Sequence, residues 1–427
     1  MIDKKKISRS RINRREFVAG AVATGAAISG FPAIANAQAT GPIKLGIPTI
    51  MSGRVAQLGI SSTNAVKMVV DAFNANGGLD GRPVELLIRD SKAKPDEAAR
   101  VTRDFVNSDE VDVVFNCEAS SASFAVQEVV REAGTLCLHN VSETSSLSAD
   151  PAIRSANSFR FARQGIHDAV GSARYAARIS EAKGLRKWMS VSPDYAYGRD
   201  NTDLFFKLLK QFGGEDIEVV GNGWPKLFQP DYTEVITQIL QKQPDAVYSA
   251  LWGGDLVSFI DQSGLYGMFE GIEFFTINLA DYTTMSALRN LPEGLHSGTR
   301  YMSSFPDIEM NRSFDAAYVE QFGDHPTNWS WECKVGAEFL LAAMTEAGSA
   351  DGVKVAEALR GMTRPSIVGV GSDNSMTLRA EDQTVINYAV GWGTTVAEEP
   401  FVTNIQAADW ADIIEHETAW KRELGYI

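Results

Sequence analysis

The sequence predicts an α/β protein built from two lobes, each with a parallel sheet flanked by helices. From Gly41 onward, short apolar runs of strand length alternate with stretches of helical periodicity. This alternation makes consecutive strands parallel and places helices on both faces of the sheet. The same rhythm restarts at Trp188. Because one hydrophobic core rarely organises more than about 250–300 residues, two such runs in 427 residues are expected to form two lobes.

The first run begins with a strand over Ile43–Pro48 and a helix over Ser62–Asn76. Apolar residues recur at helical spacing in that helix, and Gly77-Gly78 follows where a left-handed cap is expected. The chain turns at Leu79-Asp80-Gly81. The later elements are predicted as strand Val84–Asp90, helix Asp96–Asn107, strand Val111–Asn116, helix Ser121–Ala133 and strand Thr135–His139. These strands would form the first sheet.

The second run supplies the strands of another sheet. They are predicted at Trp188–Ser192, Ile217–Gly221, Ala246–Leu251 and Glu273–Ile277. The helices between them are predicted at Arg199–Phe212, Tyr232–Lys242 and Leu256–Tyr266. No short-period repeat or low-complexity linker separates the two runs, so we expect the lobes to be joined by several short crossings. The Gly-rich segment Gly294–Ser304 is predicted as one crossing.

Residues 1–39 have the pattern of a cleaved export signal. A basic segment ends in Asn13-Arg14-Arg15-Glu16-Phe17-Val18, a Gly- and Ala-rich apolar run covers Ala19–Ile34, and small residues follow for cleavage near Ala37 or Ala39. Paired arginines before Phe are typical of the twin-arginine variant. A membrane anchor would need about 20 strongly apolar residues, and this run is shorter and rich in Gly and Thr. The sequence therefore predicts an exported, periplasmic protein.

The composition is that of an ordinary globular protein, with 44% hydrophobic and 22% charged residues. The whole chain has a net charge of -14, and the leader's seven basic and two acidic residues give it +5, so the remainder carries -19. Nucleic acid and anionic membranes are bound mainly through Lys and Arg. So acidic a protein is not expected to bind either of them.

The three cysteines, Cys117, Cys137 and Cys333, lack the even count and regular spacing of a disulfide framework. Cys117 and Cys137 lie in successive apolar runs and could be neighbours, and an oxidising compartment would permit a bridge between them. Buried free thiols are the preferred interpretation.

Motifs for catalysis, metal binding and phosphate binding are absent from the sequence. The five histidines are scattered, and Trp420 stands where a zinc-binding helix beginning at His416 would need its second His. No nucleophile elbow, Walker loop, dinucleotide fingerprint or EF-hand loop is present. We therefore predict no metal, no cofactor and no enzymatic activity. An exported two-lobe α/β protein of this kind is interpreted as a binding protein.

Polar and aromatic residues follow the predicted strands, at the ends where open α/β sheets bind ligands. In the first lobe, hydroxyl-rich turns follow two strands, at Ser120-Ser121 and at Ser142-Glu143-Thr144. Serine at a helix start also caps that helix, which is the alternative interpretation of Ser120. In the second lobe the turns contain Tyr197, Trp252 and the segment Asn278–Asp281. If the lobes oppose each other, the two sets of turns enclose a ligand site.

Several short motifs occur in order along the chain, and together they resemble a known family. The motifs are Ile47-Pro48-Thr49-Ile50-Met51-Ser52-Gly53 with Gln57-Leu58-Gly59, Asn74-Ala75-Asn76-Gly77-Gly78-Leu79-Asp80-Gly81-Arg82-Pro83-Val84, Asp194-Tyr195-Ala196-Tyr197-Gly198, Gln243-Pro244-Asp245-Ala246-Val247 and Ala347-Gly348-Ser349. In order and spacing, between about Ile43 and Gly393, they resemble the type I periplasmic binding proteins of ABC transporters, the group around the leucine/isoleucine/valine-binding proteins.

The resemblance implies two Rossmann-like lobes that are joined by three crossovers and close on a ligand like a hinge. It implies lobe 1 at 40–162 plus 302–384 and lobe 2 at 163–301 plus 385–427, after the signal at 1–39. Carried over position by position, the ligand-binding residues are Leu58, Ser120, Ser121, Ser142, Glu143, Thr144, Tyr197, Trp252, Asn278 and Asp281. Asn278 stands where amino-acid binders place a Glu that pairs with the α-ammonium, and Asp281 could substitute.

This departure shapes the predicted ligand. A buried ammonium without a counter-charge is costly, so an aromatic or short aliphatic carboxylate is favoured over an amino acid. The alternative is a branched-chain or other neutral amino acid, with Glu143 or Asp281 receiving the ammonium. We expect a monomer that delivers its ligand to the membrane permease of an ABC transporter. An exported ligand-sensing module and, after it, an exported α/β enzyme are the hypotheses from other classes.

Overall fold

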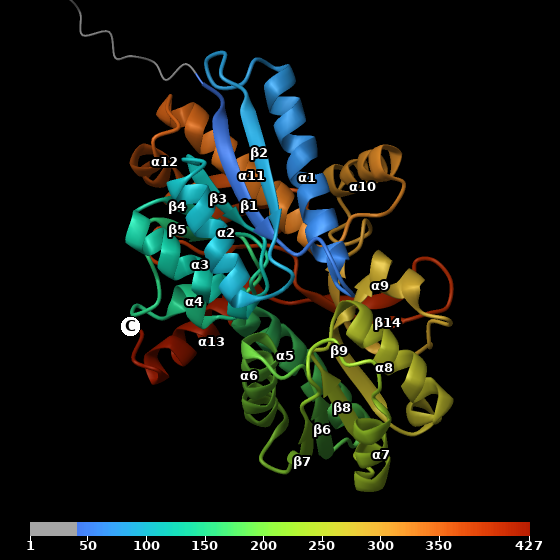
Figure 1. The fold of residues 1–427 in the computed structure, drawn as a ribbon. Coiled ribbons are helices and arrows are strands. Elements are labelled where there is room, and N and C mark those ends of the chain that lie inside the picture. Colours follow the sequence, from blue (N-terminus) through green and yellow to red (C-terminus); the bar gives the residue numbers. More distant parts are fainter. Residues whose placement is uncertain (1–40) are drawn as a thin grey trace, which may run out of the picture. The chain divides into compact units, whose positions relative to one another are not determined.

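The computed structural model describes residues 41–427, and the predicted export signal lies outside them. Its first sheet has five parallel strands in the order β2-β1-β3-β4-β5 (Figure 1). The strands are β1 (Ile43–Thr49), β2 (Val84–Asp90), β3 (Val113–Asn116), β4 (Leu136–His139) and β5 (Ser158–Arg160). All side chains of β3 and β4 are buried, as expected for a parallel sheet covered on both faces.

Helices cover both faces of the first sheet. On one face α1 packs beside α11, and on the other α2 packs beside α3. These and the neighbouring helices are α1 (Ala56–Ala75), α2 (Pro95–Asn107), α3 (Ser120–Ala133), α4 (Ser146–Ala149), α10 (Glu309–Phe322), α11 (Asn328–Ala347) and α12 (Gly352–Leu359). Each strand thus presents alternate side chains to two helical layers.

The second sheet has seven strands in the order β15-β14-β10-β9-β8-β6-β7. Strands β6 to β10 are parallel, whereas β14 pairs antiparallel with both β10 and β15. Its strands are β6 (Lys187–Val191), β7 (Glu218–Gly223), β8 (Ala246–Ser249), β9 (Glu273–Asp281), β10 (His296–Tyr301), β14 (Gly391–Thr395) and β15 (Val402–Ala407). Its helices are α5 (Gly165–Lys183), α6 (Ala196–Gly213), α7 (Thr233–Lys242), α8 (Gly253–Leu265), η1 (Met268–Glu270), α9 (Tyr282–Ala287) and α13 (Trp410–Glu423).

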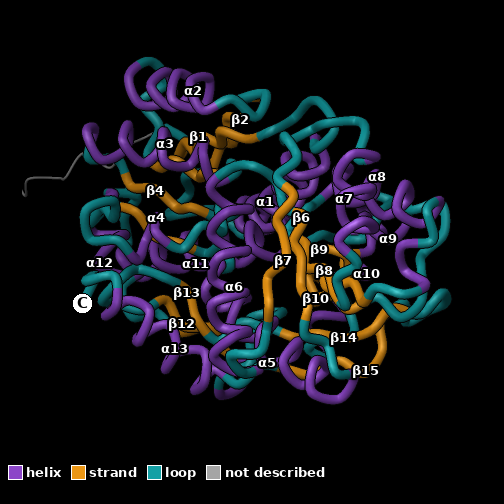
Figure 2. Tube along the Cα trace, turned by 90° about the horizontal axis from the view of Figure 1, so that it is seen from below, coloured by secondary structure: helices purple, strands orange, loops and turns teal. Residues whose placement is uncertain are grey.

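A small antiparallel sheet, β11-β12-β13, completes the described chain. Its elements are β11 (Thr363–Pro365), η2 (Ser372–Asn374), β12 (Ser375–Leu378) and β13 (Val385–Ile386). The chain passes from the first sheet to the second after β5, returns between β10 and α11, and passes again between β13 and β14 (Figures 1 and 2). The predicted fold, with two α/β lobes and parallel sheets flanked by helices, is therefore confirmed.

Two local predictions were wrong. Residues His296–Tyr301, inside the segment predicted as a crossing, form β10 within the second sheet, and the chain leaves that sheet only afterwards. Asn278–Asp281, predicted as a turn, continues β9, and every side chain of this strand after Glu273 is buried. In both segments, Gly and polar residues interrupt the apolar pattern that predicts a strand. The ends of β9 and β10, at the edge of the sheet that faces the ligand, were therefore not predicted.

The cysteines are free and buried, as preferred, but the neighbour of Cys117 is not Cys137. Val114 lies opposite Cys137 in the β3–β4 register, so Cys117, three residues further along, faces the other side of the sheet. There its Sγ lies 3.5 Å from the Sγ of Cys333 on α11.

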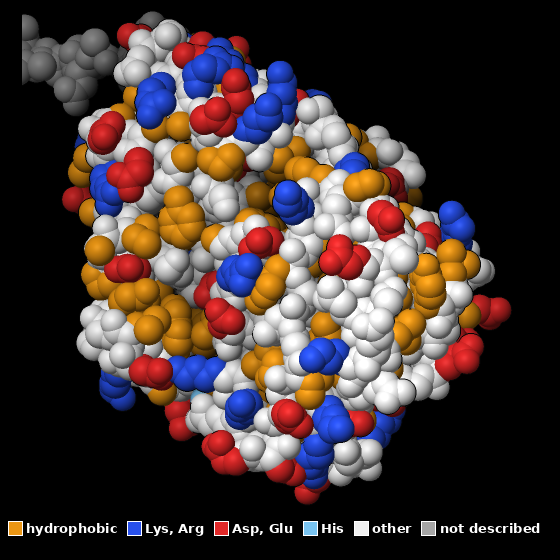
Figure 3. Space-filling model, turned by 60° about the horizontal axis from the view of Figure 1, so that its bottom comes forward, with side chains coloured by type: hydrophobic (Ala, Val, Ile, Leu, Met, Phe, Trp, Pro, Cys, Tyr) orange, Lys and Arg blue, Asp and Glu red, His pale blue; other side chains and the backbone are white. Residues whose placement is uncertain are grey.

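On the face shown in Figure 3, Lys and Arg side chains are interspersed with Asp and Glu. That face therefore shows no single basic area of the kind that binds nucleic acid. Within the described residues, no helix combines the length and the apolarity that crossing a membrane requires.

Candidate functional site

A pocket lies where the carboxyl ends of strands from both sheets meet, and it holds about 480 Å³ of empty space including its mouth. The first sheet's side contributes Leu58, Ala119, Ser120, Val141, Glu143, Asn328 and Trp329. The second contributes Tyr195, Tyr197, Trp252, Gly253, Asn278, Asp281, Thr284 and Arg300. In open α/β sheets, ligands bind at such strand ends.

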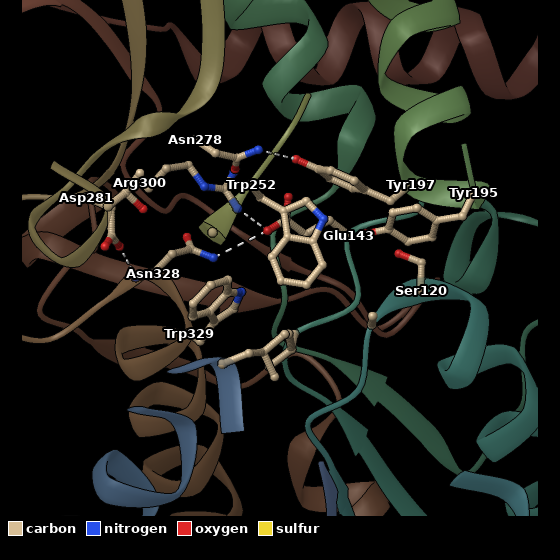
Figure 4. A pocket seen from close by; sticks show the side chains of 15 residues that line it. Ser120, Glu143, Tyr195, Tyr197, Trp252, Asn278, Asp281, Arg300, Asn328 and Trp329 are labelled. Atoms are coloured by element: carbon tan, nitrogen blue, oxygen red, sulfur yellow. Dashed lines mark hydrogen bonds and ion pairs between the residues drawn. The ribbon is translucent and has the colours of Figure 1, made fainter. Parts of the chain in front are cut away.

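Aromatic rings form much of the pocket wall. Trp252 contacts Trp329 edge to face, with 5.8 Å between the ring centroids, and the ring centroids of Tyr195 and Tyr197 lie 5.9 Å apart. Figure 4 shows Trp252 in the middle, with Tyr195 and Ser120 on one side of it and Trp329 on the other. The indole of Trp252 is buried. The wall thus offers flat apolar surface.

Helix starts position these rings. Tyr195 and Trp252 are the extended residues before α6 and α8, and each projects from the end of its strand. Gly198 permits the close approach that starts α6, because a Cβ there would lie 2.0 Å from the carbonyl oxygen of Pro193. Backbone geometry therefore fixes the turn that carries Tyr195 and Tyr197.

One end of the pocket is the amino terminus of α3. Ser120 lines the pocket there, and its Oγ accepts a long hydrogen bond of 3.4 Å from the backbone N–H of Thr144. No described group accepts a hydrogen bond from the backbone N–H of Ser120, Ser121 or Ala122. Unpaired N–H groups and the positive end of the helix dipole make this a suitable place for an anion.

The pocket is also bordered by a buried cluster of charged and polar side chains, hereafter the Glu143 cluster: Glu143, Arg300, Asp168, Arg163 and Asn328. Arg300 forms ion pairs with Glu143 and, at 3.2 Å, with Asp168, which also pairs with Arg163. Asn328 donates to Glu143 Oε1 at 3.3 Å, whereas Oε2 of Glu143 has no partner. Burial raises the pKa of Glu143 although Arg300 opposes that rise. Glu143 therefore lines the pocket with one carboxylate oxygen, Oε2, that accepts no hydrogen bond.

Asp281 and Asn278 are engaged by their own neighbours. The Asp281 carboxylate accepts the backbone N–H groups of Thr283 at 3.2 Å and Asn328 at 2.8 Å, so it caps the starts of α9 and α11. Burial raises its pKa to about 6, against these hydrogen bonds. Asn278 donates to the hydroxyl of Tyr197 at 2.9 Å and to the carbonyl of Leu251 at 3.0 Å. Neither side chain is arranged as a free counter-charge for an ammonium.

The structure brings together most of the residues that the sequence proposed for the site. The proposed residues that line the pocket are Leu58, Ser120, Glu143, Tyr197, Trp252, Asn278 and Asp281. Ser142 and Thr144 do not line it, because side chains of an extended segment alternate and the guanidinium of Arg160 holds both their carbonyls behind the wall. Ser121 faces an adjoining cavity instead.

Sequence reasoning missed Arg300, Asn328, Trp329 and Tyr195. Arg300 lies at the end of the strand that was taken for a crossing. Asn328 and Trp329 open α11, which begins with a capping box between Thr327 and Ser330. Among the described residues, no group of His, Cys, Asp and Glu could hold a metal ion.

Comparison with known proteins identifies a matching family and several relatives of this chain. A family model described as periplasmic binding protein matches residues 42–391. The Leu/Ile/Val-binding protein homolog 2 of Brucella abortus (strain 2308) is 23% identical over 324 residues, covering 74% of this chain and 82% of the relative. A leucine-, isoleucine-, valine-, threonine-, and alanine-binding protein of Pseudomonas aeruginosa is 24% identical over 367 residues, covering 85% and 93%.

Solved structures share the fold. A solute-binding protein of an ABC transporter from Rhodopseudomonas palustris BisB5, in complex with 3,4-dihydroxybenzoic acid, has a TM-score of 0.76 at 21% identity and covers 86% of this chain and 96% of its own. Another from R. palustris, in complex with benzoate, has a TM-score of 0.75 at 20% identity, with coverages of 87% and 99%.

Proposed function

Because this chain belongs to the periplasmic binding protein family, we propose that its pocket binds an aromatic or short aliphatic carboxylate between the two lobes. As a member of that family it is a substrate-binding protein of an ABC transporter and not an enzyme. In the proposed complex the carboxylate accepts the unpaired N–H groups at the start of α3, and the apolar part lies against Trp252 and Trp329.

The observation that carries this proposal is the contrast between the paired acids and the unpaired N–H groups. Asp281 already accepts two backbone N–H groups, and Glu143 is paired with Arg300. The backbone N–H groups of Ser120 and Ser121, by comparison, have no acceptor in the described chain. A ligand that supplies an anion and needs no counter-charge satisfies the donors and leaves the ion pairs intact.

A neutral amino acid is the second candidate, and one observation favours it. Oε2 of Glu143 is buried in the pocket wall without a partner, and it could accept an ammonium. The two curated relatives described above are named for amino acids. An amino acid would therefore place its ammonium at the Glu143 cluster and its carboxylate at α3.

A thermal-shift panel of matched pairs separates the two candidates. Each pair differs only in the α-amino group: 3-phenylpropanoate with L-phenylalanine, and 4-methylpentanoate with L-leucine. Benzoate, nicotinate, hydroxycinnamates and 2-oxo acids extend the acid arm. A ligand at a hundredfold over its Kd stabilises the fold by about 2.7 kcal/mol, which raises Tm visibly. The proposal expects the acids to raise Tm. If only the amino acids do, the second candidate replaces it.

Ligand closure of the lobes belongs to the same proposal. Arg54, in the loop after β1, reaches across to α8, where it donates to Ser258 Oγ at 2.6 Å and to the carbonyl of Gly254 at 3.3 Å. These contacts join the two lobes beside the pocket and would break on opening. We propose that the protein acts as a monomer, that its lobes are 40–162 plus 302–384 and 163–301 plus 385–427, and that ligand favours the closed form. Small-angle scattering should then give a smaller radius of gyration with saturating ligand, and an equal or larger radius would contradict closure.

A further inference from the structure

A second cavity adjoins the pocket on the far side of Trp252. It holds about 530 Å³ of empty space including its mouth, and we name it the side chamber. Its own lining is almost wholly apolar: Ile50, Ala93, Pro95, Ala122, Leu227 and Phe228. Ala119, Tyr195 and Trp252 line both spaces. Only these shared residues therefore separate the side chamber from the pocket.

The start of α3 lies at the boundary between the two spaces. Ser120 lines the pocket, Ser121 and Ala122 line the side chamber, and Ala119 before them lines both. The backbone N–H groups of these first helical residues have no acceptor in the described chain. An anion bound there has apolar space on two sides of it.

The outer wall of the side chamber is held in place. Phe228 has a positive φ of 67°, which is unfavourable for a bulky residue, and its N–H donates to the buried carboxylate of Asp255 at 2.7 Å. The backbone N–H of Lys226 is bound by the side chain of Gln229 at 3.0 Å. The loop that carries Leu227 and Phe228 is thus anchored to α8 and braced internally. The hydrogen bond to Asp255 stabilises the unfavourable backbone conformation of Phe228. This indicates that the wall of the side chamber is a defined part of the fold and not a gap between loops.

We infer that the side chamber receives a second apolar arm of the ligand, so that the substrate is a carboxylic acid whose carbon 2 carries two apolar groups. One group, aromatic, lies in the pocket against Trp252 and Trp329. The other, an alkyl chain, lies in the side chamber, which it reaches by separating the side chains of Tyr195 and Trp252, and the carboxylate stays at α3. This inference rests on the proposed carboxylate function and narrows its substrate class.

Three probes test it by isothermal titration. The first is 3-phenylpropanoate, which has one arm. The second is 2-butyl-3-phenylpropanoate, which has two. The third is 7-phenylheptanoate, an isomer of the second with its carbons in a single chain. Burying the butyl group should tighten binding of the two-armed acid about tenfold to a hundredfold over 3-phenylpropanoate. The linear isomer has the same number of carbons but cannot place any of them in the side chamber from carbon 2. Its affinity should exceed that of 3-phenylpropanoate by less than about threefold.

A variant that fills the chamber completes the test. Leu227→Trp should abolish the gain from the butyl group and leave the affinity for 3-phenylpropanoate unchanged. Leu265→Trp, at a residue that is 76% exposed on α8, is the matched control and should preserve the gain. An unchanged Tm for both variants shows that they fold.

The outcomes separate this inference from the function on which it rests. If 3-phenylpropanoate binds but the two-armed acid binds no tighter, or if Leu227→Trp keeps the gain, the side chamber is not a ligand subsite and the carboxylate function stands. An equal gain for the linear isomer also overturns the inference. If none of the three acids binds, the inference is overturned, and the proposed function fails with it when no acid of the thermal-shift panel raises Tm either.

Discussion

Two buried ion clusters lie near the passages between the sheets, and they differ in how completely their charges are paired. In the first, hereafter the Glu417 cluster, the carboxylates of Glu417 and Asp382 meet Arg379, Lys421 and His167. Each of the four carboxylate oxygens has a partner at 3.2 Å or less. Burial alone would raise the pKa of Glu417, but His167 and Arg379 lower it well below its ordinary value.

The Glu143 cluster has similar residue types and similar burial, yet it leaves Oε2 of Glu143 without a partner. Here burial prevails, and the pKa of Glu143 rises. The Glu143 cluster borders the pocket, and the Glu417 cluster does not. Of these two clusters, the fully paired one thus lies away from the pocket, whereas the incompletely paired one borders it.

The largest expected effect is the loss of stability when the Glu417 cluster is broken. Arg379→Met removes the cation that binds both carboxylates and leaves buried charge behind, so the free energy of unfolding should fall by about 3–5 kcal/mol. Urea denaturation measures it. Arg312→Met, which removes an exposed Arg that pairs with Asp307 and Glu309, is the control and should change stability far less. A loss no greater than that of the control would refute a structural role for the cluster.

At the start of α3, replacing Ser120 and Ser121 together with Ala should weaken acid binding by about 1.5–3 kcal/mol, because two hydroxyls near the bound carboxylate are lost. Ser120→Ala alone should account for most of the loss with 3-phenylpropanoate, since only Ser120 lines the pocket. Isothermal titration provides the values, with Ser313→Ala on the exposed side of α10 as control. Unaltered affinity in the double variant would remove these residues from the site.

A smaller effect is expected from Glu143→Gln, which removes the incompletely paired carboxylate of the Glu143 cluster. Removing a negative charge near the pocket should leave acid binding unchanged or tighten it by about 1 kcal/mol. An amino acid whose ammonium pairs with Glu143 should instead lose affinity. Titration of 3-phenylpropanoate and L-phenylalanine on the same variant distinguishes the two cases. Weaker binding of the acid would show that Glu143 contributes to its recognition.

The smallest effect concerns pH. Asp281 has a pKa of about 6 in the folded protein, raised by burial, so it gains its charge mainly between pH 5 and 7. Because the folded state holds this proton more tightly than the unfolded chain, its contribution to stability is present below about pH 4 and is lost as pH rises through 6. A ligand carboxylate in the same pocket should bind about threefold more weakly at pH 7.5 than at pH 5. Asp281→Asn should flatten that dependence, and an unchanged slope in the variant would assign it to another group.

Periodicity predicted the parallel strands well, because each is a short apolar run bounded by turn residues. The predicted strand Val84–Asp90 agrees with β2 at both ends, and the predicted start of α3 is one residue late. Periodicity failed where strands contain Gly and polar residues, as in β10 and β14, or where a helix such as α5 is rich in Ala and Gly. Those segments take their structure from packing between sheets and helices, which no local pattern records.

Some residues of the candidate site could be predicted from local sequence patterns, and others could not. Ser120, Tyr197 and Trp252 follow strands that were predicted, so their convergence at one edge followed from topology. Arg300 and Trp329 come from an unpredicted strand end and from a helix that returns to the first sheet after a long passage through α10. Their position depends on how distant segments pack together, and sequence spacing contains no measure of it.

The most direct test of carboxylate binding at α3 is a crystal structure of the protein with the acid that raises Tm most in the matched panel. We expect a carboxylate oxygen within about 3.2 Å of the backbone N–H groups at Ser120 and Ser121, with the ion pair between Arg300 and Glu143 intact. A carboxylate bound instead to Arg300, with Glu143 displaced, would contradict it.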